Sequence, residues 1–177
     1  NYNAAVNATQ SVIVSIVPIS IFSNPITGAS PGNSNPYTIG QSVNSNISVT
    51  GIGRGVGVAT RTGNDRYNTT GWTSSTTPSL SDDYFEFNLT PNNGYFIDFE
   101  QFQFTHQRAG FGPSSFAVRS NVDSFASNLN VYTNSGTSIA VTENLALTTT
   151  AFDDIRNQIT FRIYGYNATS NIGTGSI

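Results

Sequence analysis

Several residue types are absent from this 177-residue sequence, and charge of either sign is scarce. There is no cysteine, which excludes both a disulfide framework and a metal site built on thiolates. Lysine is also absent, so all seven basic residues are arginines. Only 10% of the residues are charged, against about 25% in an ordinary globular domain, and the net charge is −3. Because the sequence has no basic cluster, we expect no nucleic-acid partner.

The scarcity of charge also bears on association and location. A surface with little net charge offers little repulsion between copies, which favours self-association. No stretch reaches the roughly 18 apolar residues of a membrane-spanning helix, so no membrane span is predicted. A lack of cysteine and lysine with abundant asparagine and threonine is typical of exported surface proteins. The sequence begins at Asn1, and we expect a removed signal peptide and an extracellular or cell-surface location.

The residues that are present favour β-structure. Asn, Ser and Thr (21, 22 and 22 residues) make up over a third of the chain, and they form helices poorly because their side chains compete for backbone hydrogen bonds. A helical turn is predicted only within 151–157. Alternating or β-branched segments predict strands near 43–49, 85–89, 95–104 (with a bulge near Glu100), 115–120, 129–133, 138–148 and 158–166. The sequence therefore predicts an all-β, jelly-roll-like β-sandwich with an N-terminal extension strand.

The most apolar run of the chain extends from Val12 to Phe22. β-branched residues occupy both of its faces, which is typical of a strand buried on more than one side. Pro18 removes one backbone donor, which predicts an edge or a bulge at that position. The apolar positions of this predicted strand are Val12, Ile13, Val14, Ile16, Val17, Ile19, Ile21 and Phe22. We divide the chain into an N-terminal apolar strand (1–28), a linker (29–40) and a sandwich domain (41–177).

Candidate catalytic groups are few. His106 is the only histidine, and neither a cysteine nor a serine in a nucleophile-elbow context accompanies it, so we interpret it as a residue at a strand end or on the rim of the sandwich. Alternating glycines from Gly51 to Gly57 superficially resemble a phosphate-binding loop. No helix pattern follows them, and we interpret them as sites of close backbone approach. We therefore expect no enzymatic activity and no cofactor.

Two further kinds of site remain open as alternatives. Paired carboxylates in loops do not show the two groups across a cleft that glycoside hydrolysis needs, but Asp153, Asp154 and Asn157 are weak candidates for a calcium site. Aromatic residues stack on sugar rings where their faces are exposed. The candidates for such a carbohydrate-binding platform are Trp72, Tyr67, Tyr84 and Tyr166.

Two segments carry a family resemblance. Residues 112–120 read Gly-Pro-Ser-Ser-Phe-Ala-Val-Arg-Ser, and residues 160–168 read Thr-Phe-Arg-Ile-Tyr-Gly-Tyr-Asn-Ala, followed by Gly173-Thr174-Gly175. With the spaced aromatics before them, they resemble secreted bacterial β-sandwich modules of the kind found in surface proteins with a PEP-CTERM-type sorting signal. The resemblance covers roughly 50–177, and it implies a sandwich fold and an extracellular location but no activity. Such modules continue past the glycine pair into a closing strand, whereas this sequence stops at Ile177.

These features lead to two functional hypotheses. An additional apolar strand at the front and an expected missing strand at the back predict donor-strand exchange, in which the N-terminal strand of one subunit completes the sheet of the next. The leading hypothesis is therefore an extracellular structural subunit that polymerises into a filament with identical subunits. The alternative is a monomeric carbohydrate-binding or adhesive module that recognises glycans.

Overall fold

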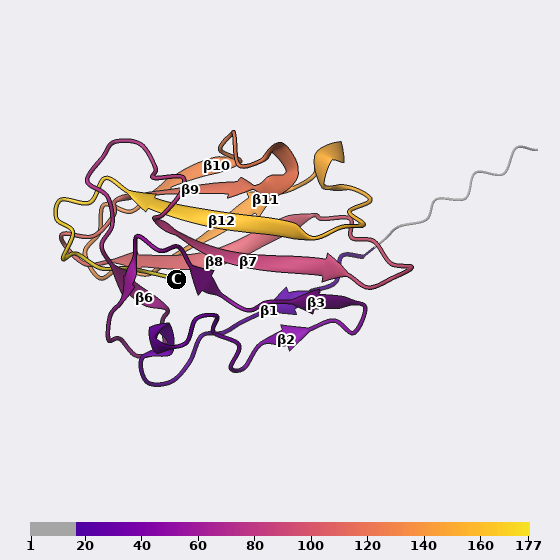
Figure 1. The fold of residues 1–177 in the computed structure, drawn as a ribbon, viewed down its shortest axis with the longest axis horizontal. Helices are drawn as coiled ribbons and strands as arrows, with labels where there is room; N and C mark the ends of the chain where they lie inside the picture. The colour runs from indigo at the N-terminus through magenta and orange to yellow at the C-terminus, as the bar shows by residue number, and fades with distance from the viewer. Residues whose placement is uncertain (1–16) are drawn as a thin grey trace, which may run out of the picture.

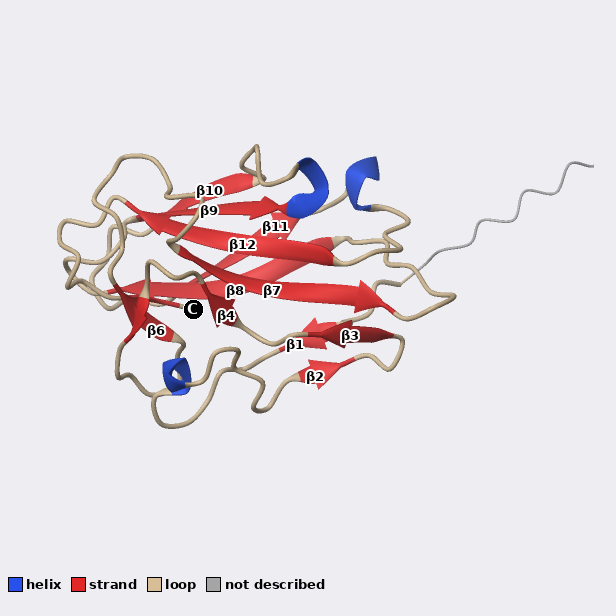
Figure 2. Cartoon of the chain, in the orientation of Figure 1, coloured by secondary structure: helices blue, strands red, loops and turns tan. Residues whose placement is uncertain are grey.

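The computed structural model describes residues 17–177, which form two antiparallel β-sheets packed face to face. In this described part of the chain, strands are the main regular structure and the helical content is limited to three short 3₁₀ turns (Figures 1 and 2). The predicted all-β sandwich is confirmed. Because β-sheets hide one face from water, stacking two of them buries the alternate apolar residues of each strand.

Each sheet combines strands from distant parts of the sequence. The first sheet contains β10 (Asn130–Thr133), β9 (Ser115–Ser120), β12 (Ile159–Tyr166), β7 (Tyr84–Pro91) and β3 (Ile47–Val49) in that order, and β4 (Gly53–Arg54) also pairs with β7. The second contains β11 (Val141–Ala146), β8 (Gln101–Arg108), β13 (Gly175–Ser176), β6 (Asn68–Thr70) and β5 (Ala59–Thr60). A separate pair consists of β1 (Phe22–Ser23) and β2 (Ser42–Val43), and the 3₁₀ turns are η1 (Pro31–Asn33), η2 (Asn121–Asp123) and η3 (Thr150–Phe152).

The chain repeatedly crosses from one sheet to the other. β7 lies in the first sheet, β8 in the second and β9 in the first again, and the later strands β11, β12 and β13 alternate in the same way. Only β1 with β2, β5 with β6 and β9 with β10 are sequence neighbours that pair among the described strands, and β7 pairs instead with β12 over six residues. These crossovers give the sandwich its jelly-roll-like character.

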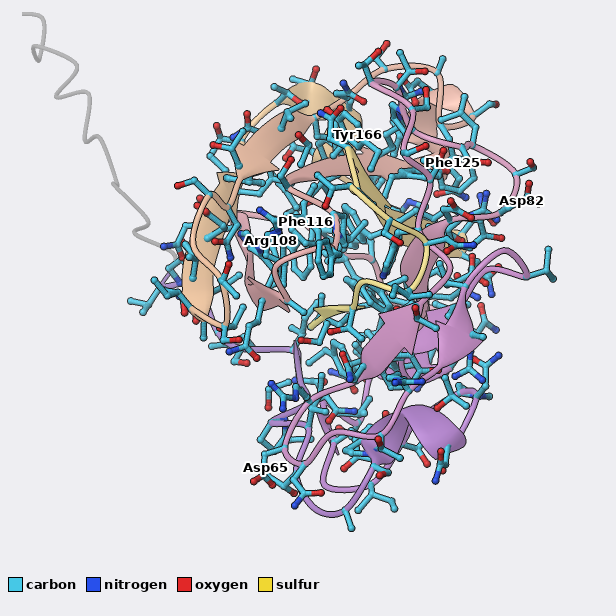
Figure 3. All side chains as sticks on the ribbon, turned by 90° about the vertical axis from the view of Figure 1, so that its left-hand side faces the viewer. Asp65, Asp82, Arg108, Phe116, Phe125 and Tyr166 are labelled. Atoms are coloured by element: carbon cyan, nitrogen blue, oxygen red, sulfur yellow. The ribbon has the colours of Figure 1, made fainter. Side chains whose placement is uncertain are left out.

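The core is aromatic and lies between the two layers. β7 contributes Phe85, Phe87 and Leu89 from alternate positions, as a strand with one buried face does. Phe161 of β12 lies 5.6 Å from Phe87, measured between ring centroids. Viewed from one end, Phe116 of β9 lies in the interior between the sheets, whereas Asp65 and Asp82 lie at the periphery (Figure 3).

Most predicted strands are present, with two exceptions. The strand predicted near 43–49 is divided by a turn into β2 and β3. β7, β9, β10, β11 and β12 fall within or close to the predicted ranges. The strand predicted over 95–104 begins only at Gln101, because Ile97 makes no more than an isolated bridge to Ile155. The helical turn predicted within 151–157 is the single turn η3, which begins at Thr150.

The segment predicted as a linker (29–40) is part of the domain. Pro31, Gly32 and Tyr37 are buried, and the backbone N–H of Tyr37 donates to the carbonyl of Ile52 at 2.8 Å. The guanidinium of Arg54 donates to the carbonyl of Gly32 at 2.6 Å. A flexible spacer does not make such contacts, so the predicted boundary at residue 41 is wrong. The turn residues of this segment form an ordered loop because their backbone groups find partners on the sheet.

The glycines of 51–57 permit close backbone approach, as interpreted from the sequence. The backbone N–H of Gly55 donates to the backbone carbonyl of Tyr84 at 2.9 Å, and that of Gly57 donates to the backbone carbonyl of Asp82 at 3.1 Å. A Cβ atom at position 55 would lie only 2.0 Å from the backbone oxygen of Asp82. A side chain there forces two backbone segments apart.

We therefore expect Gly55→Ala to lower the free energy of unfolding by about 1–3 kcal/mol, since overpacking against a backbone atom cannot be relieved by a rotamer change. Gly110→Ala is the matched control, because the nearest atoms to its added Cβ are 3.7 Å away on the Thr137 side chain. Urea unfolding of the two variants beside the parent protein measures both effects. Equal stability of the two variants contradicts the close-approach interpretation.

Candidate functional site

The second sheet has a gap beside β8. On one side, residues 101–106 of β8 pair continuously with β11. On the other side, β13 pairs only with Gln107 and Arg108. Within the described residues 17–177, positions 101–106 therefore have a strand neighbour on one side alone. We call this open side of residues 101–106 the β8 gap.

The β8 gap lies inside the sheet and not at its outer edge. β13 continues the sheet from β8 to β6 at one end of the strand, and the C-terminus lies between these two strands (Figure 1). The sequence of 101–106 is Gln-Phe-Gln-Phe-Thr-His, which contains no lysine and no proline. Free strand edges are commonly protected from pairing by such residues. The β8 gap has neither of these protections.

A large groove adjoins the β8 gap. It has a volume of about 1640 Å³ and is bordered by β8 and by the N-terminal residues 17–26. Phe87 and Leu89 of β7 and Phe161 of β12 also line it. Small-molecule pockets typically have volumes of roughly 300–1,000 Å³, so this groove is larger than most of them.

The floor of the groove is closely packed. The ring of Phe22 lies 5.7 Å from that of Phe87, and the ring of Phe102 lies 5.1 Å from it, between centroids. Phe87 and Leu89 are consequently 6% and 2% exposed. The open volume therefore lies along the edge of β8 and not inside the core.

The N-terminal residues 17–26 also line the groove. Val17 and Ile19 are 78% and 70% exposed, whereas Ile21 and Phe22 pack against the core and Phe22 pairs with Val43 in β2. The predicted donor strand over 12–22 is therefore too long at its C-terminal end, since Ile21 and Phe22 are bound by their own domain. Its remaining positions Val12, Ile13, Val14 and Ile16 lie outside the described residues.

Exposed aromatic residues gather at one end of the groove. Tyr95 and Phe96 are 48% and 51% exposed, and both line the groove. The guanidinium of Arg156 lies 5.1 Å above the ring of Phe96 and forms an ion pair with Asp154 at 2.6 Å. The backbone N–H of Asp154 donates to a carboxylate oxygen of Asp98 at 2.7 Å. This end of the groove therefore combines apolar ring faces with polar groups.

The four aromatic residues predicted as a sugar-stacking platform are buried. Trp72, Tyr67, Tyr84 and Tyr166 expose 1%, 0%, 8% and 8% of their surface. Trp72 packs edge-on against Phe85, with ring centroids 5.0 Å apart, and its indole N–H donates to the carbonyl of Thr69. Sugar stacking needs an open ring face, and these residues present none. The exposed pair Tyr95 and Phe96 was missed, although it directly follows the Asn-Asn-Gly turn, where exposure is common.

The calcium candidates lie at the surface, and one of them is held by an arginine. Asp153, Asp154 and Asn157 are all exposed, and the carboxylate of Asp154 is engaged by Arg156. Across residues 17–177, no three His, Asp or Glu side chains are grouped so that they could hold a metal ion.

None of the helical turns that the structure describes is long and apolar enough to cross a membrane.

His106 lies in the interior, and its predicted place on the surface or rim is wrong. Its ring is 0% exposed and lies 4.3 Å from the ring of Phe116, between centroids. Nε2 lies 3.4 Å from a carboxylate oxygen of Glu143, and Nδ1 has no hydrogen-bond partner among residues 17–177. Burial lowers the pKa of His106 below its usual value of 6.5, and the nearby Glu143 opposes this effect only in part.

Comparisons with known proteins leave the family open. No family model and no curated protein matches the chain. A solved structure similar to this chain is CBM29_1, a family 29 carbohydrate binding module from Piromyces equi, which is 14% identical with a TM-score of 0.40. The similarity covers 88% of this chain and 85% of that one. At this level of similarity, no ligand and no binding face is transferred to this chain.

The buried histidine makes stability depend on pH. Below pH 6.5 the unfolded chain binds a proton at His106 more readily than the folded chain does. The free energy of unfolding is therefore unaffected by this residue above pH 6.5 and declines as the pH falls below it. We expect the urea midpoint of the parent protein to fall between pH 7 and pH 5. In His106→Gln the slope over this range becomes smaller, and because no other histidine exists the difference in slope reports His106 together with its partner Glu143. Parallel slopes for the two proteins contradict the assignment.

Proposed function

We propose that this chain is an extracellular structural subunit that assembles into a homopolymer by accepting a β-strand from a neighbouring copy at the β8 gap. The observation that carries the proposal is the one-sided pairing of residues 101–106 inside an otherwise continuous sheet. A strand in that position satisfies the backbone donors and acceptors of β8 and completes the second sheet.

The side chains around the gap favour a peptide strand as the occupant. Phe102, Phe104 and His106 of β8 point towards the core, and Gln101, Gln103 and Thr105 alternate with them on the exposed face. An added strand with one apolar and one polar face extends this alternation. The groove is also as long as the edge that must be covered, since it is lined by every residue from Gln101 to Gln107.

The rest of the sequence supports a second copy of this chain as the source of the strand. Residues before Val17 include the β-branched run that begins at Val12. A net charge of −3 over 177 residues gives weak repulsion between copies. Insertion of the N-terminal segment of one copy into the groove of the next is a head-to-tail contact, and repetition of such a contact produces a filament.

The test compares assembly of the full chain with that of a chain lacking residues 1–16. This deletion retains every contact described above, because the described domain begins at Val17. We expect filaments from the full chain by electron microscopy and monomers from the deletion variant by light scattering. A chain with residues 1–16 in shuffled order keeps length and composition, and it is expected to assemble poorly. A full chain that stays monomeric at all concentrations contradicts the proposal.

A second candidate function is carbohydrate binding at the end of the groove. It is favoured by the exposed pair Tyr95 and Phe96 beside Asp98 and Arg156, since stacking rings and nearby polar groups suit a sugar.

Calorimetric titration with soluble polysaccharides tests this second function. If it is correct, the double substitution Tyr95→Ala and Phe96→Ala lowers affinity at least tenfold. Phe111→Ala is the matched control, because Phe111 is 60% exposed and does not line the groove. Absence of binding in the parent protein, or equal losses in both variants, argues against this function.

A further inference from the structure

The residues that precede the described domain alternate in polarity. From position 2 to position 16, every even-numbered residue except Gln10 is apolar. Among the odd-numbered residues only Ala5 and Ile13 are apolar. A period of two over fifteen residues is the pattern of a strand with one buried and one exposed face. The even-numbered residues are Tyr2, Ala4, Val6, Ala8, Gln10, Val12, Val14 and Ile16.

The β8 gap sets the length of strand that it can accept. Six residues of β8, 101–106, have an open side, and they span about 20 Å at the rise of a strand. Six residues of an added strand cover this edge, with three side chains turned inwards and three outwards. The added strand must therefore contain three apolar residues at alternate positions.

Residues 11–16, with the sequence Ser-Val-Ile-Val-Ser-Ile, meet this requirement best. Their even face carries Val12, Val14 and Ile16, all of which are β-branched. Their odd face carries two serines and Ile13, which suits a position that stays at the surface. The earlier window 3–8 offers only Ala4, Val6 and Ala8 inwards, which bury less apolar area.

We propose that residues 11–16 of a second copy fill the β8 gap with Val12, Val14 and Ile16 facing the groove floor. This inference rests on the proposed function and specifies its partner, inserted segment and face. A shift by one residue turns Ser11 and Ser15 towards the aromatic floor at Phe87 and Phe161, where their hydroxyls lack partners. The alternation of polar and apolar residues therefore determines which face of the inserted strand turns towards the groove floor.

The chain around the insertion argues for a second copy over self-insertion. Phe22 is anchored to β2, and Val17 and Ile19 line the groove with exposed side chains. For residues 11–16 to reach β8 of their own domain, the chain must reverse near Val17. Residues 14–20, Val-Ser-Ile-Val-Pro-Ile-Ser, contain no glycine, asparagine or aspartate, which two-residue hairpin turns prefer, and their only turn-forming residues are Pro18 and two serines.

The test compares two full-length variants that carry the same new residue on opposite faces of the inserted segment. Val14→Asp places a carboxylate on the inward face, and Ile13→Asp places the same group one residue away on the outward face. We expect Val14→Asp to raise the critical concentration for filament formation at least tenfold, since the burial of one valine alone is worth roughly that factor. Ile13→Asp is expected to change it less than about threefold, and Val14→Ile to leave assembly intact. Thermal melting below the critical concentration confirms that the domain itself is unchanged.

A synthetic peptide of residues 9–18 provides a second measurement on the full chain. Added in excess, the parent peptide is expected to cap filaments and shorten them, the Ile13→Asp peptide to do the same, and the Val14→Asp peptide to have no effect.

A greater loss of filament assembly or of peptide capping with Ile13→Asp, or equal losses for both substitutions, overturns the assigned face while leaving strand donation intact. A parent chain that forms no filaments and ignores the peptide overturns the proposed function itself. A concentration-independent monomer whose melting temperature falls only with Val14→Asp shows insertion into the same chain and overturns the second-copy assignment.

Discussion

Backbone hydrogen bonding across the second sheet is the constraint around which this structure is organised. A strand in the middle of a sheet needs partners on both sides, but β8 pairs with β11 only at residues 101–106 and with β13 only at Gln107 and Arg108. Residues 101–106 carry the aromatic side chains of the core on one face, so they cannot turn away from the sandwich to seek other partners. The strand is therefore held in place by its side chains while one row of its backbone groups remains open to pairing.

Some of the few charged residues are held by other groups of the fold. Arg162 pairs with Glu86 at 3.0 Å and lies between the rings of Tyr84 and Phe125, at 4.0 and 4.2 Å from their centroids. Arg119 donates to the carbonyls at the tip of the loop after η2. With these groups engaged in the fold, little charge remains to keep copies of the protein apart, which is consistent with a subunit that packs against its own kind.

From the sequence, an aromatic residue could either fill the core or stack on a sugar at the surface, and its position in the fold decides between these two roles. Trp72 and Tyr67 lie at the junction between β6 and the first sheet, so they are enclosed by Phe85 and by polar partners. Tyr95 and Phe96 are of the same chemical kind but lie in the loop between β7 and β8, outside both layers. The number of aromatic residues indicates a large core, but the choice between core and surface depends on where each chain segment packs.

The sequence by itself determined the all-β class, most strand positions and the alternating N-terminal segment, because these follow from local polarity and residue shape with a period of two. It also indicated that Gly55 and Gly57 allow close approach. Only the tertiary structure decided that His106 is buried, that 29–40 packs on the domain and that residues 101–106 of β8 have a strand neighbour on one side alone within residues 17–177. These features depend on which distant strands become neighbours, and β8 meets β13 across more than sixty residues of chain. Local pattern carries no information about such pairings, since many strands of this sequence could accept the same partner.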